Sequence, residues 1–155
     1  MVLFEAARWA ASSYNEQPWF FIYGTKENPA IYEKLYSCLN EFNKKWAGEA
    51  PVLMLTGVKT FFEETKKKNA HALHDLGLAM GNFTYQASKF NIMVHHMAGF
   101  QPSLAKEYFN IPDGYEAVTM VAIGYADETK TNRKRKPLQD FVFDKVLNDK
   151  GLPMP

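Results

Sequence analysis

The stretch that decides the fold is residues 10–23, A-A-S-S-Y-N-E-Q-P-W-F-F-I-Y. Residues 3–9, just before it, have the small and apolar spacing of a short helix. Residues 19–23 are an aromatic and β-branched run of strand length. Between the two lies a polar segment, residues 12–17, which we call the elbow; its hydrogen-bonding side chains are Ser12, Ser13, Asn15 and Gln17. The sequence therefore predicts a helix, a polar elbow and a strand in direct succession.

Pro18 controls the expected shape of the elbow. Proline fixes its own φ and disfavours helical backbone at the preceding residue, so the elbow is expected to be stiff and Gln17 to be extended. Two interpretations are open. Ser and Asn favour turns for local reasons, so the elbow could be a capped loop. Alternatively, its polar groups point at a ligand.

Composition limits the function classes. The chain has 155 residues, which suggests one domain over 1–155, and 46% hydrophobic with 23% charged residues is ordinary for a globular protein. A net charge of +1 gives no whole-molecule field that favours nucleic acid or an anionic membrane. Cys38 is the only cysteine, which excludes an internal disulfide. No apolar run reaches membrane-spanning length and the start is not a signal peptide, so a cytoplasmic location is expected.

Periodicity places further elements along the chain. Ile31, Leu35 and Leu39 share one face of a helix that Asn28 would cap and Pro29 would begin. Buried strands are predicted at 51–58 and 118–125. A further strand is predicted at 92–96, a short helix from Pro102, and a long helix over 70–91.

The long helix carries small residues where a neighbour could approach. Gly77, Ala79 and Gly81 leave parts of its surface bare, and each glycine costs about 1 kcal/mol against alanine inside a helix. Another helix is therefore expected to pack closely there. The core side of this helix is predicted to carry Leu73, Leu76, Met80, Phe83 and Ala87.

The start of the same helix carries possible metal ligands. His71, His74 and Asp75 fall on one face, but nothing in the sequence places a further ligand. Polar groups near a helix start are the favoured interpretation, and no metal is predicted.

The elbow also carries a family resemblance. A-R-W-A-A-S-S-Y-N-E-Q-P-W, residues 7–19, resembles the flavin-binding elbow of the nitroreductase family, usually written A-R-W-A-P-S-S-x-N-x-Q-P-W. Ala11 stands where the family usually has proline. The resemblance implies that the four polar elbow residues bind the ring and ribityl chain of FMN: Ser12, Ser13, Asn15 and Gln17.

A second segment, H-M-A-G-F at 96–100, resembles the same family when followed by I-P-D-G-Y at 111–115. The resemblance implies that the backbone of Met97, Ala98 and Gly99 lies against the flavin ring near its reactive nitrogen. A peptide N–H can bond the ring edge, and a small residue lets the backbone come close. His96 could polarise the ring, or it could be a strand-end histidine satisfied by backbone.

A third segment is R-K-R-K-P at 133–137. It resembles the family's basic segment that contacts the FMN phosphate, which implies that Arg133 and Arg135 bind phosphate; a basic surface turn is the alternative. Residues 138–146 then read as a tail strand that crosses to the other subunit in the family. Asn43 lies near an amide that the family turns toward the flavin, but a solvated loop amide is favoured.

One departure concerns the N-terminal side. The chain opens directly into a helix, whereas the family has an earlier helix and an Arg-Ser-rich phosphate grip, so the chain is expected to be N-terminally short. This departure keeps an alternative open, in which a truncated or degenerate member binds flavin weakly and acts as a ligand-binding or dimeric non-catalytic protein.

The resemblance implies an α+β fold, a three-layer α-β-α sandwich with a mixed sheet, built as an intertwined homodimer with FMN at the interface. It implies an FMN-dependent oxidoreductase: NADH or NADPH reduces the flavin and leaves, and a nitroaromatic, quinone or similar electron-poor acceptor is then reduced in a ping-pong reaction. Because the flavin carries the chemistry, no side chain is predicted as acid, base or nucleophile.

Overall fold

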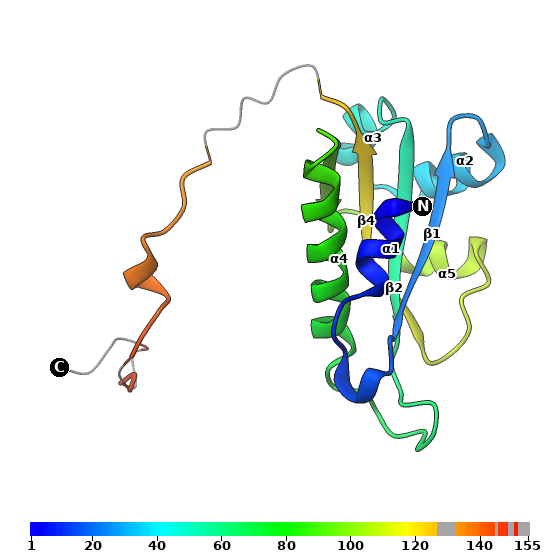
Figure 1. Cartoon of the computed structure of the whole chain (residues 1–155). Helices are drawn as coiled ribbons and strands as arrows, with labels where there is room; N and C mark the ends of the chain where they lie inside the picture. The colour runs from blue at the N-terminus through cyan, green and yellow to red at the C-terminus, as the bar shows by residue number, and fades with distance from the viewer. Residues whose placement is uncertain (127–132, 145, 149–150, 152–155) are drawn as a thin grey trace.

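A four-stranded sheet divides the molecule into layers, in a computed structural model that describes residues 1–126, 133–144, 146–148 and 151. The strands are β1 (Trp19–Thr25), β2 (Val52–Lys59), β3 (Met93–Met97) and β4 (Tyr115–Gly124). The helices are α1 (Val2–Arg8), α2 (Pro29–Cys38), α3 (Glu41–Ala47), α4 (Ala72–Ser88) and α5 (Pro102–Tyr108). As Figure 1 shows, α1 and α4 cover one face, and α2, α3 and α5 lie on the other. The predicted three-layer α+β sandwich is confirmed.

The strand order is β1-β2-β4-β3, and all three neighbouring pairs are antiparallel. The mixed sheet predicted from the sequence is therefore wrong for the described part of one chain. The reason lies in the connection through α4. That helix joins β2 to β3, which run in the same direction, but β4 lies between them and pairs with both in the opposite direction.

The buried strand predicted at 51–58 is confirmed: β2 pairs on both edges and is buried on both faces, so it is a central strand. Alternate residues of β2 enter opposite layers. Leu53 and Leu55 pack in the cluster with α2 and α5, while Met54 and Val58 pack in the cluster with α4. One strand thus joins the two halves of the core.

The helix boundaries follow the expected signals. α2 begins at Pro29 after Asn28, as predicted, and Cys38 is buried at its end. α3 was not predicted; its N-cap is Asn40, whose side chain accepts a hydrogen bond from the N–H of Asn43. α4 is confirmed as the longest helix that the structure describes, although Leu73 is 57% exposed rather than part of the core.

The strand predicted at 138–146 is wrong for the residues that the structure describes; residue 145 lies outside them. A single 3-10 turn forms at Leu138–Asp140, and the tail extends away from the sheet in Figure 1. A strand needs a partner for its backbone groups, and none of the chain's own described strands pairs with the tail. Within the described ranges, no helix is both long and apolar enough to cross a membrane.

Candidate functional site

The elbow has an unusual backbone. Three non-glycine residues have positive φ: Tyr14 at 53°, Asn15 at 56° and Gln17 at 49°. Such conformations cost of order 1–3 kcal/mol each and collect at functional sites. The extended Gln17 predicted from Pro18 is therefore wrong. Its N–H donates to Ser12 Oγ at 3.0 Å and its side-chain amide donates to the Asn15 carbonyl at 3.2 Å, and this closed ring of bonds overrides the proline effect.

Both sides of the elbow are anchored. The N–H of Ser13 donates to the carboxylate of Asp75 in α4 at 3.1 Å, and Asp75 is only 2% exposed. At the other end, Glu16 forms an ion pair with Lys59 at 2.6 Å and accepts the N–H of Glu63 at 2.9 Å. The elbow is thus fixed to α4, to the end of β2 and to the following loop.

The ion pair sets the protonation state of its members. The hydrogen bond from Lys59, opposed by desolvation, holds the pKa of Glu16 below its usual value. The same bond raises the pKa of Lys59. Both groups therefore stay charged across the neutral pH range.

A shallow hollow of about 260 Å³ lies between the elbow and the start of α4. Ser12 and Ser13 line it together with Asp75. Within the described residues, the hydroxyl of Ser13 and the side chain of Asn15 have no hydrogen-bond partner. Ser12 and Gln17 form hydrogen bonds within the elbow, whereas the side chains of Ser13 and Asn15 are fully available to a ligand.

The same hollow contains the three residues that the sequence offers as possible metal ligands. His71 and His74 line it, and the Asp75 carboxylate accepts the Ser13 N–H. Among the described residues, no group of three or more His, Cys, Asp and Glu side chains could hold a metal ion.

The Met97–Gly99 segment lies at the end of β3. Met97 is buried and Ala98 is exposed. The Gly99 carbonyl accepts the N–H of Asn40 at 3.0 Å and the side-chain amide of Asn43 at 2.9 Å. A Cβ at Gly99 would lie 2.3 Å from the Asn40 amide nitrogen, so the close approach requires glycine.

Asn43 corrects a prediction. It is not a solvated loop amide but a residue of α3 that is 7% exposed. The sequence signal that could have found it is the spacing of Asn40 and Asn43, because an N-cap Asn accepts the N–H three residues later. The contact with Gly99 joins residues 56 apart, and no local pattern reveals it.

His96 points to the other layer. Its Nε2 lies 3.3 Å from Thr84 Oγ1 in α4, so its partner is a side-chain hydroxyl rather than backbone. Partial desolvation, with a smaller contribution from the charge of His95, lowers the pKa of His96. The imidazole is therefore neutral at pH 7.

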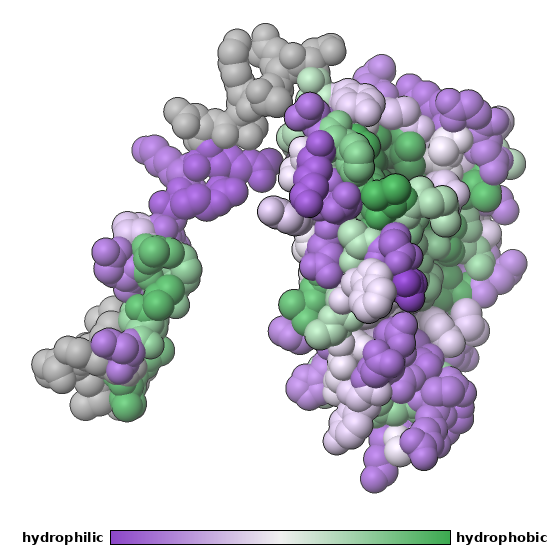
Figure 2. Space-filling view, viewed as in Figure 1, coloured by the Kyte–Doolittle hydropathy of each residue, from purple (hydrophilic) through white to green (hydrophobic). Residues whose placement is uncertain are grey.

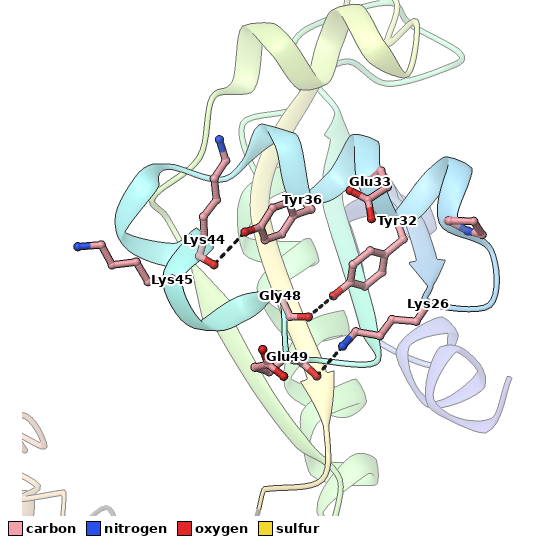
Figure 3. Close-up of a pocket in the computed structure, with 9 residues that line it drawn as sticks. Lys26, Tyr32, Glu33, Tyr36, Lys44, Lys45, Gly48 and Glu49 are labelled. Carbon is pink, nitrogen blue, oxygen red and sulfur yellow. Dashed lines mark hydrogen bonds between the residues drawn. The ribbon is translucent and has the colours of Figure 1, made fainter.

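α3 is a firm support for the Gly99 carbonyl. Tyr36 of α2 donates to the Lys44 carbonyl at 3.1 Å, and Tyr32 donates to the Gly48 carbonyl at 3.1 Å (Figure 3). Tyr32 also donates to the Ala50 carbonyl at 2.7 Å. Lys26 adds a bond to the Glu49 carbonyl at 3.3 Å. These groups line a cleft of about 620 Å³ whose hydroxyls are already used to hold the helix.

The basic segment lies at the other end of β3. Arg133 lines a cavity of about 340 Å³ together with Trp46 and His95, whose rings meet edge to face at 4.7 Å. Arg135 is exposed. In Figure 2 the basic residues form a hydrophilic patch just before the apolar tail.

One chain does not bring all the predicted residues together. The elbow lies with α1 and α4 on one face of the sheet, whereas Gly99 is held by α3 on the other. Arg133 lies near Met93, at the opposite end of β3 from Gly99.

α4 also presents an open apolar groove of about 750 Å³. Leu73 and Tyr85 on its walls are 57% and 71% exposed, and His96 and Thr84 lie beside them. No atom comes within 4 Å of a Cβ built at Gly77 or Gly81. The predicted bare surface of this helix is confirmed.

Comparison with known proteins agrees with this geometry. A sequence profile described as the Nitroreductase family matches residues 1–125. A solved structure described as an oxidoreductase containing FMN superposes with a TM-score of 0.88 at 29% identity, covering 95% of this chain and 80% of its own. A putative nitroreductase from Bacillus subtilis gives a TM-score of 0.76 at 20% identity, and the superposition covers 91% of this chain and 84% of the relative.

A nitroreductase family protein from Streptococcus pneumoniae TIGR4 gives a TM-score of 0.74 at 20% identity, and the superposition covers 93% of this chain and 87% of the relative. An uncharacterised 15.4 kDa protein of Mycolicibacterium smegmatis is 28% identical over 89 residues. That match spans 54% of this chain and 60% of the relative's length.

Proposed function

The chain belongs to the nitroreductase family, and we propose that it is an FMN-dependent oxidoreductase. In this proposal NADH or NADPH supplies the hydride, and an electron-poor acceptor such as a nitroaromatic or a quinone receives it in a second, ping-pong step. One observation carries the proposal. The elbow that resembles the family's flavin-binding segment is strained, anchored at both ends, and leaves Ser13 and Asn15 to bind a ligand.

The residues present fit FMN in three respects. The hollow beside the elbow offers the hydroxyl of Ser13, and the elbow also carries the side-chain amide of Asn15; both groups suit the ring and ribityl chain. The backbone next to Gly99 can meet a flat ring, since Ala98 is exposed. Arg133 and Arg135 supply guanidinium groups that bind phosphate through paired hydrogen bonds.

When bound, FMN supplies the hydride-carrying ring. The chain's own residues bind and orient it. Ser12 and Gln17 keep the elbow in its strained form, while Ser13 and Asn15 bind polar atoms of the cofactor. Neutral His96 lies beside α4, where it can line the space for ring or substrate without adding a charge.

A homodimer is part of the proposal because the site residues lie in different layers of one chain. Two-fold symmetry would place the elbow of one subunit near Gly99 of the other and give two identical sites. The groove of α4, with Gly77 and Gly81 bare, suits close packing against the same helix of the partner.

The tail supports the same arrangement. Its apolar side chains are exposed in one chain. Full burial of a large apolar side chain contributes about 1.5–3 kcal/mol to the free energy of folding or association. A partner subunit can cover this apolar stretch, which is visible in Figure 2. It comprises Leu138, Phe141, Val142, Phe143, Val146 and Leu147. A cytoplasmic location stays a prediction.

The proposal is tested by titrating FMN into the purified chain and following flavin fluorescence. We expect saturable binding at one FMN per chain and bleaching of the bound flavin by NADH or NADPH. The double variant Ser13→Ala/Asn15→Ala should bind FMN at least several-fold more weakly. Asn82→Ala, an exposed change elsewhere on α4, is the control and should bind normally. Equal binding by both variants would contradict the assigned role of the elbow.

A further inference from the structure

The backbone of 98–100 has an unusual division of hydrogen bonds. The carbonyls of Ala98 and Gly99 are both engaged: Phe100 N–H donates to Ala98 at 3.0 Å, and Asn40 N–H and the Asn43 amide donate to Gly99 at 3.0 and 2.9 Å. In the described part of the chain, the N–H groups of Ala98 and Gly99 donate to no acceptor. Donors left open at an exposed turn are available to a ligand.

These bonds form a chain that ends at the N–H of Gly99. A peptide unit is planar, and its C=O and N–H point in opposite directions when it is trans. Asn40 and Asn43 hold the Gly99 carbonyl, which fixes the plane that contains Phe100 N–H. Phe100 N–H then holds the Ala98 carbonyl, which fixes the next plane. The Gly99 N–H belongs to that plane and must point away from the held carbonyl.

The two asparagines hold each other in place as well. Asn40 Oδ1 accepts the N–H of Asn43 at 2.9 Å, so one residue caps α3 and sets the position of the other. The fit is tight, because a Cβ on Gly99 would lie 2.3 Å from the Asn40 amide nitrogen and 2.8 Å from that of Asn43. Asn43 is 7% exposed, which shields its bond to Gly99 from water.

We propose that Asn40 and Asn43 are positioning residues that aim the N–H of Gly99 at the edge of the flavin ring; this rests on the proposed function. A donor fixed before the ligand arrives binds more tightly, because no reorganisation is needed. Asn43 acts through Gly99, because its side-chain amide donates to the Gly99 carbonyl.

The test uses the full chain labelled with ¹⁵N, together with an FMN titration. Asn43→Asp keeps the size but replaces the donor with a carboxylate that faces a carbonyl. We expect it to bind FMN about tenfold more weakly and to lose the FMN-induced shift of the Gly99 amide signal. The matched control is Glu41→Gln, which removes an exposed side-chain ion pair with Lys44 within α3 and should leave both readouts near wild type.

Hydrogen exchange in the wild-type chain gives a second test that needs no variant. FMN should slow exchange at Gly99 N–H, while Phe100 N–H should already be protected without FMN. If wild type binds FMN but exchange at Gly99 is unchanged, or if Asn43→Asp matches Glu41→Gln, the positioning role is overturned and the proposed function stands. If wild type binds no FMN, both are overturned.

Discussion

The carboxylate of Asp75 accepts the backbone N–H of Ser13 at 3.1 Å, and this bond joins residues 62 positions apart. Asp75 lies in the first turn of α4, where a negative charge interacts favourably with the helix dipole. One buried side chain therefore stabilises the helix start and holds the strained elbow against it. The sequence presented Asp75 only as a possible metal ligand, and its role in the fold is different.

Asp75→Ala should lower the free energy of unfolding by about 1–3 kcal/mol, because the Ser13 N–H loses its acceptor. Asp75→Asn keeps an acceptor oxygen and loses only the charge, so its loss should be about 0.3–1 kcal/mol. Urea unfolding of the two variants measures the difference. Equal losses would mean that the bond to Ser13 contributes nothing.

The Glu16–Lys59 pair should make stability depend on pH at both ends of the range. Glu16 has a lowered pKa in the folded chain. Its contribution to stability is therefore present above its unfolded pKa, about 4.3, and is lost as pH falls through the folded pKa. Lys59 has a raised pKa, so its contribution is present below about pH 10.4 and is lost as pH rises through the folded value.

Glu16→Gln should therefore lower stability by about 1 kcal/mol at pH 7 and weaken its acid dependence. Glu41→Gln is the control, since Glu41 pairs with Lys44 but its side chain is 87% exposed. The measurement is thermal unfolding between pH 3 and pH 8, in ~1-unit steps. If the difference in melting temperature between Glu16→Gln and wild type stayed constant over that range, the lowered pKa of Glu16 would be contradicted.

His96 should titrate below the ordinary histidine pKa of about 6.5, which proton NMR of the ring can measure. Because the folded pKa is lowered, its contribution to stability is present above about pH 6.5 and is lost as pH falls through the folded value. His96→Asn should remove this part of the pH dependence. His74→Asn, at an exposed position of α4, is the control. A titration of His96 at or above the ordinary value would be incompatible with its place beside Thr84.

Substituting the glycines of α4 tests the proposed dimer, because the melting temperature should change in opposite directions with and without a close helix–helix contact. In a lone exposed helix, Gly77→Ala/Gly81→Ala would stabilise by about 0.5–1 kcal/mol for each site. In a close helix–helix contact the added methyl groups would separate the subunits. We expect the double variant to elute closer to monomer size and to melt at a lower temperature than wild type. A dimer with a raised melting temperature would show that α4 is not the contact.

The sequence was informative wherever periodicity or composition was strong. The central strand β2 shows an apolar run on both faces, and α4 shows a long helical repeat with bare glycines, so both were predicted close to their bounds. The elbow was located from its polar cluster and from Pro18. These features depend on neighbours in the sequence, which is why the sequence alone reveals them.

The errors concern contacts between distant segments. Asn43 reaches Gly99 across 56 residues, and Gln17 takes a left-handed conformation because the elbow closes on itself through Ser12. The expected tail strand needs a partner for its backbone groups, and the described residues of one chain do not supply it. Local propensity cannot predict an outcome that tertiary contacts decide.

The visible absorbance of the purified chain, recorded after FMN has been added and the excess removed by desalting, tests the central claim most directly. The account predicts retained flavin bands at about one FMN per chain, in a species that elutes as a dimer and is bleached by NADH or NADPH. A colourless protein after desalting, with wild-type fold by circular dichroism, would contradict the assignment of this chain as an FMN-dependent oxidoreductase.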